Sequence, residues 1–568
     1  TGMLPKWSDD LLAFKIEETS RSLTLVGEAN GDRSLEEALR VGQETSISIC
    51  REMGFLFTSG SPPSLPEVKS ANEGPAMPLF LVPHVKQPSR APKQFVDFQL
   101  DVTAAAISQA VKEGFESIEH VKRYTALGFG TDQGKIGNVN GIAIVSAELK
   151  RPMAEVGTTV FRPNYTPVSF GSIAGRDSED LFEPKRYTPL HSRHEQKGAL
   201  FEDVGQWKRP WYFPKSGESM PQTLARECLS VRQQVGILDA STLGKIDIQG
   251  PDSREFLNRI YTNDWSRLPI GRCKYGVMCT EDGMVFDDGV TACIGERHFL
   301  MTTTTGGASR VLEWLEAWLQ TEWTELRVFC NSVTDHWATI AISGPYARKL
   351  LSKVTDIDLG EQEFRFMDWR EGLVAGIPAR VFRISFTGEL SYEINIQADY
   401  ATDVWDTLME HGESYQICPY GTETMHILRA EKGFIIVGQD TDGSVTPKDL
   451  GLDWAIAKHK TFSFLGERGM EREDCLRPNR KQLVGLKTLD AESVLEEGAQ
   501  IVLDLKQTKP MDMVGHVTSS YFSPIMGHSI ALALVESGHQ SYGKMVYVSD
   551  ENRKFQKAEI CSPVFYDP

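Results

Sequence analysis

The sequence predicts a multidomain α+β protein, and three observations support this fold class. Its 568 residues are too many for one hydrophobic core and suggest three or four domains. An alternating strand, a Gly-Pro turn and a helix occur twice, at residues 246–257 and 340–351. This echo favours a pseudo-symmetric pair of α+β lobes, with two coincidental turns as the alternative. Runs of strand-forming residues after about residue 481 indicate a separate small β domain.

The first segment, residues 1–58, resembles the end of a larger domain. Residues 22–26 read as a strand, and Gly27 and Gly31 predict a turn that leads into a helix. One strand and one helix cannot bury a core alone, so we expect this piece to pack on a partner sheet, either from another chain or from a missing N-terminal region. Residues 59–94 are rich in proline and serine and predict a linker.

Residues 95–160 predict a small helical domain. Thr103 is suited to cap a helix over AAAISQAVKEGF, and SIEHVKRYTALGF gives a second amphipathic helix. The glycine-rich stretch GFGTDQGKIGNVNG follows a helical segment and lacks the spacing of a phosphate-binding loop, so we interpret it as a connector. A second linker, residues 161–185, introduces the large region of residues 186–480.

Two adjacent aspartates interrupt the apolar strand predicted within EDGMVFDDGV, residues 281–290. Successive strand side chains point to opposite faces, so Asp288 shares the more apolar face with Phe286 and Val290, and Asp287 lies on the other. Burying an unpaired carboxylate costs several kcal/mol, so such residues are usually paired, hydrogen-bonded or functional. An edge strand with both carboxylates in water is the alternative, and these ten residues alone favour it.

Charge and cysteine content narrow the class of partner. A formal net charge of −18 argues against nucleic acid or an anionic membrane as the main partner, because both need basic surface. We find neither a run of about 20 apolar residues nor a signal-peptide pattern. The nine cysteines are scattered without a C-x-x-C motif, which predicts no metal or iron–sulfur site. Unpatterned thiols in a large chain suggest a reducing compartment, the cytoplasm.

From about residue 186 to residue 568 the sequence resembles the glycine-cleavage T-protein family of folate-dependent aminomethyltransferases. Nine motifs in family order carry this resemblance: YTPLH, GILDAS, the first Gly-Pro turn, KYGVMCTEDGMVFDDGV, HFLMTTTTGG, the second Gly-Pro turn, SFTGELSYEI, LRAEKG and GQDTDGSVTP. The resemblance implies T-protein-like lobes that form a folate-binding domain over residues 186–480. It also implies a β-barrel-like domain over residues 481–568.

The resemblance implies roles for particular residues. Asp288 corresponds to the family's key aspartate, beside N10 of tetrahydrofolate, and is the predicted catalytic residue. Glu393 corresponds to the glutamate that binds the pteridine ring, since a carboxylate can accept two parallel N–H bonds. Tyr275 matches an aromatic residue near the folate. The backbone from Met301 to Thr303 matches the stretch that lines the pterin.

Arg429, in the LRAEKG motif, is also a candidate folate-binding residue, with a structural helix arginine as an equal alternative. The sequence departs from the family pattern at Thr303 and Thr304, where Asn-Ala is usual, and at Met425, where arginine is common. These departures bear on recognition of the amine or of a lipoyl group more than on folate binding.

Over its whole length the chain resembles the α subunits of heterotetrameric sarcosine oxidases, without their N-terminal half. The added signatures are FVDFQLDVT, EGFESIEHVKRYTALGFGTDQGK, FRPNYTPVSFGSIAGR and MHILRAEKGFIIVGQDTDG. In those subunits a GxGxxG nucleotide domain precedes this segment, and residues 1–58 resemble its closing strand and helix. The resemblance implies a flavin-containing β subunit and small γ and δ subunits as partners. FAD and FMN are expected to be bound mainly by a partner subunit or shared with it. NAD binding is expected only where the preceding domain is present.

These resemblances imply an enzyme: the tetrahydrofolate-binding subunit of a flavin-dependent N-methylamine (sarcosine) oxidase complex. It would convert the imine from oxidative demethylation into 5,10-methylenetetrahydrofolate and glycine. The alternative is a free-standing aminomethyltransferase that acts with a lipoyl carrier protein, and a third hypothesis is a non-enzymatic folate-binding module. Residues 1–175 separate the first two, because only an oxidase subunit gives them a role.

Overall fold

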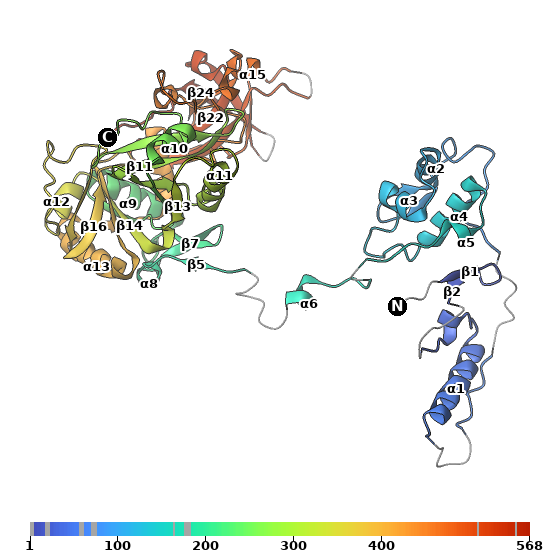
Figure 1. Cartoon of the computed structure of the whole chain (residues 1–568). Coiled ribbons are helices and arrows are strands. Elements are labelled where there is room, and N and C mark those ends of the chain that lie inside the picture. The colour runs from blue at the N-terminus through green and yellow to red at the C-terminus, as the bar shows by residue number, and fades with distance from the viewer. Residues whose placement is uncertain are drawn as a thin grey trace. The chain divides into compact units, whose positions relative to one another are not determined.

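A computed structural model describes residues 5–16, 23–55, 62–69, 77–162, 165–174, 183–507, 510–550 and 554–568. The chain forms two compact units, Thr1–Glu179 and Asp180–Pro568 (Figure 1). Among the described residues, no helix combines the length and the apolar character that crossing a membrane requires.

The first unit begins with a short hairpin and a long helix. Strand β1 (Lys6–Ser8) pairs with β2 (Ala13–Lys15), and α1 (Leu35–Glu52) follows the 3-10 turn η1 (Gly27–Asn30). The Ser34 side chain caps α1 by accepting a hydrogen bond from the Glu37 backbone N–H at 3.1 Å. The predicted strand at residues 22–26 is wrong for residues 23–26, which are not in a strand, and residue 22 lies outside the described residues. A strand needs a neighbour for its backbone groups, and none pairs with this segment within the described residues.

The rest of the first unit contains the predicted helices. The Thr103 hydroxyl accepts a hydrogen bond from the Ala106 N–H at 3.2 Å, which confirms the predicted cap. The helices surround a core that includes Ile107, Val121 and Ile142, all at most 1% exposed. The described elements of this part are β3 (Phe95–Asp97), β4 (Val102–Thr103), α2 (Ala104–Lys112), α3 (Ile118–Thr125), α4 (Asn138–Leu149), α5 (Met153–Val156) and α6 (Phe170–Ala174).

Two mixed α+β lobes form most of the second unit, as the sequence repeat predicted. The sheet of the first lobe has the strand order β10-β11-β12-β9-β13, and that of the second lobe has the order β15-β16-β17-β14-β8-β18. The first-lobe elements are β9 (Gly244–Gln249), α10 (Ser253–Ile260), β10 (Cys273–Cys279), β11 (Val285–Gly295), β12 (His298–Thr303), α11 (Ala308–Thr321) and β13 (Phe329–Ser332). The second-lobe elements are β8 (Gly236–Asp239), β14 (Trp337–Ser343), α12 (Ala347–Leu351), β15 (Trp369–Val374), β16 (Ile377–Phe382), β17 (Ser391–Gln397), α13 (Ala401–Gly412) and β18 (Cys418–Pro419).

The two Gly-Pro turns occupy equivalent places in the lobes. Gly250 joins β9 to α10 with φ 141°, and Gly344 joins β14 to α12 with φ 128°. A Cβ atom on Gly344 would lie 2.6 Å from the backbone oxygens of Val231 and Gln234, so the turn requires glycine. The lobes also exchange strands: β8 precedes β9 but pairs with β14, and β13 precedes β14 but pairs with β9. Each lobe is therefore completed by a strand from the other half of the repeat.

A third sheet and three helices connect the lobes to the rest of the unit. The hairpin β6–β7 and the short β5 form a three-stranded sheet, and α14 contacts β7 as well as the C-terminal barrel. The elements of this layer are β5 (Arg186–Tyr187), α8 (His191–Gln196), β6 (Leu200–Val204), β7 (Trp207–Tyr212), α9 (Met220–Gln233) and α14 (Thr422–Lys432). The short helices of the unit are η2 (Thr334–His336), η3 (Ala398–Tyr400), η4 (Glu413–Tyr415), η5 (Asp453–Ala455), η6 (Gly469–Glu471), α15 (Glu473–Leu476) and η7 (Gly538–Gln540).

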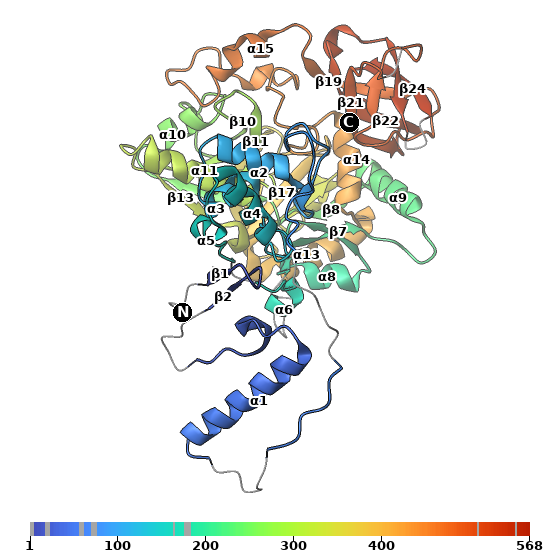
Figure 2. The same cartoon turned by 90° about the vertical axis from the view of Figure 1, so that its right-hand side faces the viewer.

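The predicted C-terminal β domain is a closed barrel with the strand order β19-β22-β21-β20-β23-β24. Figure 2 shows α14 running beside it, in agreement with its contacts to β21 and β22. The barrel strands are β19 (Lys481–Thr488), β20 (Gln500–Val502), β21 (Gly515–Ser523), β22 (His528–Glu536), β23 (Met545–Ser549) and β24 (Phe555–Cys561).

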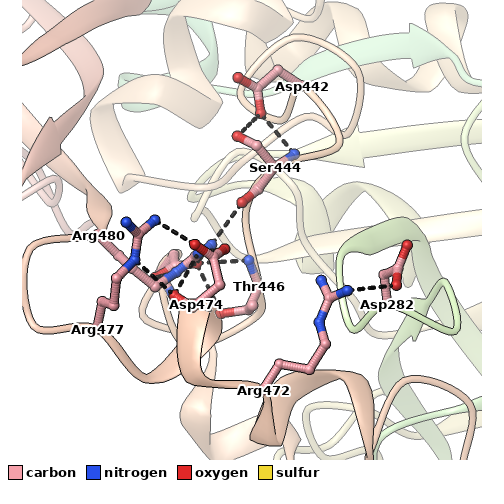
Figure 3. A network of polar contacts seen from close by, with 9 residues as sticks. Asp282, Asp442, Ser444, Thr446, Arg472, Asp474, Arg477 and Arg480 are labelled. Atoms are coloured by element: carbon pink, nitrogen blue, oxygen red, sulfur yellow. Dashed lines mark hydrogen bonds and ion pairs between the residues drawn. The ribbon is translucent and has the colours of Figure 1, made fainter.

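Arg480 fastens the start of the barrel to the preceding loops. Its guanidinium donates to both carboxylate oxygens of Asp449, at 2.7–3.1 Å, and to the backbone oxygen of Ser444 at 2.6 Å (Figure 3). Asp449 also accepts two hydrogen bonds from Thr446. Leu450, the residue after Asp449, borders the cavity described below, so this network holds one wall of the cavity against the barrel.

Candidate functional site

A cavity of about 1210 Å³ lies within the Asp180–Pro568 unit. Residues of both lobes, of the β6–β7 hairpin, of α14 and of the barrel line it. Its walls carry large apolar and aromatic side chains together with a few charged groups, the mixture that is typical of small-molecule sites. The main wall residues are Tyr275, Val290, Phe366, Ile384, Phe386, Tyr420, Ile435, Leu452, Trp454, Leu483 and Tyr542.

Asp288 on β11 borders this cavity, and so does the adjacent Asp287. Its Oδ2 accepts a hydrogen bond from the Tyr275 hydroxyl at 2.7 Å, and Tyr275 stands on the neighbouring strand β10. Burial raises the pKa of Asp288 to about 7 against the lowering effect of this hydrogen bond, and the adjacent Asp287 raises it further. Burial and Asp288 keep the Tyr275 pKa well above its ordinary value, so the phenol remains a donor.

A β-bulge corrects one part of the face argument. Met278 pairs with Asp287 and Cys279 pairs with Val285, which leaves Phe286 as an extra residue on β11. The Phe286 ring packs against Trp314 of α11, with centroids 4.7 Å apart, in the core on the helix side of the sheet. Phe286 therefore does not share a face with Asp288, because the bulge breaks the alternation between them.

Asp287 is the more completely bonded member of the pair. Its carboxylate accepts hydrogen bonds from the Asp288 N–H at 2.7 Å and from the Thr304 N–H and hydroxyl at 3.3 and 3.1 Å. It is 1% exposed, and burial raises its pKa to about 6 although all three donors lower it. Asp287 thus holds the loop between β12 and α11, and Asp288 is left with one donor.

Glu393 on β17 borders the same cavity from the second lobe. Within the described residues its carboxylate has no hydrogen-bond partner, and burial raises its pKa to about 7. The nearby Lys245 opposes this rise, but the Lys245 ammonium donates to the backbone oxygens of Ser241 and Leu243, at 2.9 and 3.1 Å. The carboxylate is therefore available to a ligand with N–H donors.

The remaining predicted residues separate into two groups. Thr303 is 2% exposed and borders the cavity at the end of β12. The Met301 side chain is fully buried in the core between the first sheet and its helices. Only the backbone of Met301 could therefore line a pterin, as the resemblance implies. Arg429 is also fully buried and donates to Asp440 Oδ2 at 2.5 Å and to the Ser519 hydroxyl at 2.7 Å. This arrangement, which ties α14 to the barrel, is that of the structural alternative, and a folate role for Arg429 stays a prediction.

Sequence reasoning missed several charged residues that border the cavity, among them Glu202 on β6 and Arg209 on β7. They stand opposite one another in the hairpin, and both border the cavity. Neither residue belongs to a recognised motif, and their opposition depends on the hairpin register. The charged residues within residues 200–204 and 207–212 were the only available signal.

Comparison with known proteins agrees with this architecture. Residues 190–460 match the GCVT N-terminal domain, residues 481–567 the glycine cleavage T-protein C-terminal barrel domain, and residues 91–176 the sarcosine oxidase A3 domain. The aminomethyltransferase of Thermotoga neapolitana is 32% identical over 61% of this chain and 89% of its own length. The crystal structure of aminomethyltransferase T from Bartonella henselae shows the same fold, with a TM-score of 0.59 and 24% identity over 67% of this chain and 98% of that one.

The chain therefore belongs to the aminomethyltransferase family. Its similarity to sarcosine oxidase α subunits extends further along the sequence. It is 46% identical to that of Corynebacterium sp. (strain P-1) over 99% of this chain and 58% of the relative. The subunit of Rhizobium meliloti (strain 1021) is 40% identical over 100% of this chain and 57% of the relative. The chain thus spans a little less than three fifths of the length of these α subunits.

Proposed function

We propose that this chain is the tetrahydrofolate-binding subunit of a flavin-dependent N-methylamine oxidase complex, with sarcosine as the amine. The observation that carries the proposal is the cavity itself, in which Asp288 from one lobe and Glu393 from the other keep accepting capacity for a ligand. The similarity to sarcosine oxidase α subunits over the whole chain supports the assignment. By the same similarity we propose a flavin-containing β subunit, small γ and δ subunits and a cytoplasmic location.

The cavity fits a reduced pterin with its attached chain. An aminopterin edge presents parallel N–H groups, which suit the Glu393 carboxylate, and the aromatic walls suit the flat ring. The cavity exceeds the roughly 300–1,000 Å³ of typical ligand sites, so it has room for the amine as well. Glu393 is the proposed anchor of the ring, and Thr303 and the backbone at Met301 are proposed wall elements. FAD and FMN belong to the partner subunits in this scheme, and NAD to the domain that precedes this segment in the relatives.

The reaction requires a proton carrier next to the folate nitrogens. The flavin of a partner subunit would supply the two-electron oxidation that converts sarcosine into the iminium CH₂=NH⁺–CH₂–COO⁻. One folate nitrogen attacks the methylene carbon, and the second then displaces the amine and closes 5,10-methylenetetrahydrofolate. Both N–H protons of the folate end on the departing nitrogen, which leaves as glycine. A positioned general base typically contributes 10²–10⁴-fold to such a step.

Asp288 is suited to this proton transfer. With a pKa of about 7 it is present in both protonation states near neutral pH, so it can accept a proton from N10 and return one to the leaving amine. The Tyr275 hydroxyl fixes the orientation of the carboxylate. Rapid attack by the folate nitrogens inside the cavity would limit hydrolysis of the iminium, which would release formaldehyde.

The second candidate is a free-standing aminomethyltransferase that acts with a lipoyl carrier. The identity to aminomethyltransferases favours it, but that similarity covers only 61% of the chain in the Thermotoga neapolitana comparison. Residues 91–176 match the sarcosine oxidase A3 domain, for which this alternative has no role. Native mass spectrometry of the complex purified from cells tests the choice. Flavin-containing partner subunits are expected, whereas a lipoyl protein without a flavoprotein would favour the alternative.

The catalytic proposal is tested by D288N in the purified complex. With sarcosine and tetrahydrofolate, the rate of methylenetetrahydrofolate formation is expected to fall about 10²–10⁴-fold while flavin reduction by sarcosine stays unchanged. D282N is the matched control, because Asp282 lies in the turn before the same strand and is 70% exposed. An unchanged yield in D288N would reduce the chain to a non-enzymatic folate-binding module.

A further inference from the structure

A pair of opposite charges on the β6–β7 hairpin has no role in the proposed proton transfer. Glu202 and Arg209 are directly paired residues of these antiparallel strands, and both border the cavity. Side chains at such positions project from the same face, with Cβ atoms about 4.5–5.5 Å apart. Among the described residues, however, neither side chain forms an ion pair or a hydrogen bond with the other or with a third group.

Both side chains keep a buried atom without a partner. Oε1 of Glu202 and Nε of Arg209 are shielded from solvent and lack a hydrogen-bond partner in the described residues. Burial lowers the Arg209 pKa from its ordinary value, and the nearby Glu202 and Asp239 carboxylates oppose this lowering. An arginine guanidinium stays protonated in proteins, so Arg209 is a cation. Leaving buried charged groups unpaired is costly in a folded protein, and a ligand that bonds to both would remove the cost.

Neighbouring polar groups are neutral or already bonded. Burial, with Arg429 and Arg209 nearby, lowers the His426 pKa to about 3, so this imidazole is uncharged. The Glu423 carboxylate accepts the Trp211 indole N–H at 2.8 Å, and the Gln439 amide donates to Glu497 and to Tyr521. Within the described part of the chain, Glu202 and Arg209 are therefore an anion and a cation in directly paired positions, each with a buried atom that lacks a hydrogen-bond partner.

We propose that Glu202 and Arg209 form a subsite for the zwitterion of an α-amino acid, with its carboxylate on Arg209 and its ammonium group on Glu202. The guanidinium fork matches a carboxylate, and the Glu202 carboxylate accepts from an ammonium group. The inference rests on the proposed function, in which glycine is formed inside this cavity. The iminium that precedes glycine carries the same carboxylate, so Arg209 also retains the iminium while the folate nitrogens attack.

Direct binding of glycine tests this subsite. Equilibrium dialysis of the tetrahydrofolate-loaded complex with radiolabelled glycine is expected to show a saturable site. R209M and E202Q should each weaken it at least about tenfold, the usual scale for losing a charged hydrogen bond. K208M is the matched control, since Lys208 lies next to Arg209 but is paired with Asp203 at 2.5 Å. Unchanged glycine binding in R209M and E202Q would overturn the proposal.

Folate affinity separates this subsite from a second source of carboxylate, the glutamyl tail of the folate. R209M is expected to bind tetrahydrofolate and tetrahydropteroate, which lacks glutamate, as tightly as the unmodified complex. Selective weakening of tetrahydrofolate would instead assign Arg209 to the glutamyl tail and overturn the amino-acid subsite. Retained folate affinity also shows that the variant is folded. If glycine binding is unchanged in R209M and E202Q but D288N still forms methylenetetrahydrofolate slowly, the subsite is refuted and the proposed function stands. If D288N forms methylenetetrahydrofolate at the normal rate, the proposed function fails, whatever the glycine measurements show.

Discussion

Two buried arginines of the second unit differ in how fully the protein satisfies them. Arg232 on α9 donates to Glu431 at 2.5 and 3.0 Å, to Glu389 at 3.0 Å and to two backbone oxygens at 2.8 and 3.1 Å. Arg209 has no hydrogen bond from its side chain within the described residues, and its Nε is buried without a partner. The fully bonded arginine joins α9 to α14 and to the segment that precedes β17, whereas the other borders the cavity.

The same contrast holds for the carboxylates. Glu431 accepts from Arg232 and, through its other oxygen, from the Ser523 hydroxyl at 2.6 Å. Glu393 borders the cavity without a hydrogen-bond partner in the described residues. A buried charge that the protein satisfies completely stabilises an arrangement of elements. A buried charge without a hydrogen-bond partner reduces stability, and a bound ligand that pairs with it would offset this loss.

The largest expected effect concerns Arg232. R232M leaves Glu389 and Glu431 buried without their cation, so the free energy of unfolding should fall by about 3–5 kcal/mol. R209M should change it by less than about 1 kcal/mol, because Arg209 has no bonded partner to lose. Denaturant unfolding of the purified complex, followed by the fluorescence of this chain's tryptophans, compares the two variants. A loss in R209M as large as that in R232M would contradict the distinction.

The second prediction concerns Glu393, whose removal should affect binding and stability in opposite directions. E393Q replaces an acceptor of two N–H groups by an amide, so tetrahydrofolate affinity should fall about 10- to 100-fold, the scale of charge-assisted hydrogen bonds. The control is E371Q, because Glu371 is 62% exposed and pairs with Arg380 on the surface of the same sheet. Isothermal titration with tetrahydrofolate measures both. An unchanged tetrahydrofolate affinity in E393Q would show that Glu393 does not bind the folate.

The stability of E393Q should depend on pH with a defined sign. The folded-state pKa of Glu393 is raised to about 7, so the stability it contributes is present at low pH and is lost as pH rises through 7. Glutamine does not titrate, so E393Q should be more stable than the unmodified chain at pH 8, with a smaller difference at pH 5. The expected change of this difference is roughly 1–3 kcal/mol after allowance for solvent screening. Unfolding curves at both pH values check it, and a difference that shrinks at pH 8 would contradict it.

The sequence contained enough information to predict the two lobes and to select Asp288 as a candidate, because both inferences depend on local pattern. The Gly-Pro turns predicted the repeat, and strand alternation selected Asp288. The exchange of β8 and β13 between the lobes was beyond this reasoning, because strand pairing between distant segments is not encoded in periodicity. The bulge at Phe286 also escaped it, since one unpaired residue changes the faces without changing composition.

Motifs gave the positions of site residues but not the directions of their side chains. Met301 and Arg429 lie within matching motifs, yet both side chains point into packed interior. Glu202 and Arg209 lie in no motif, yet the hairpin register places both beside the cavity. Whether a buried charge is fully bonded depends on tertiary contacts, so this distinction required the structure.

The smallest expected effect concerns an ion pair at the surface. Arg472 donates to Asp282 at 2.8 Å (Figure 3), and the two side chains are 48% and 70% exposed. The side chains of the Arg480–Asp449 pair are 9% and 5% exposed. Exposed pairs contribute about 0–1 kcal/mol, so R472M should lower the free energy of unfolding by less than about 1 kcal/mol. R480M removes the cation that pairs with the buried Asp449 carboxylate, so it should lower the free energy of unfolding several times more than R472M does. Denaturant unfolding of both variants compares them, and equal losses would show that burial and complete bonding do not determine what a charge contributes here.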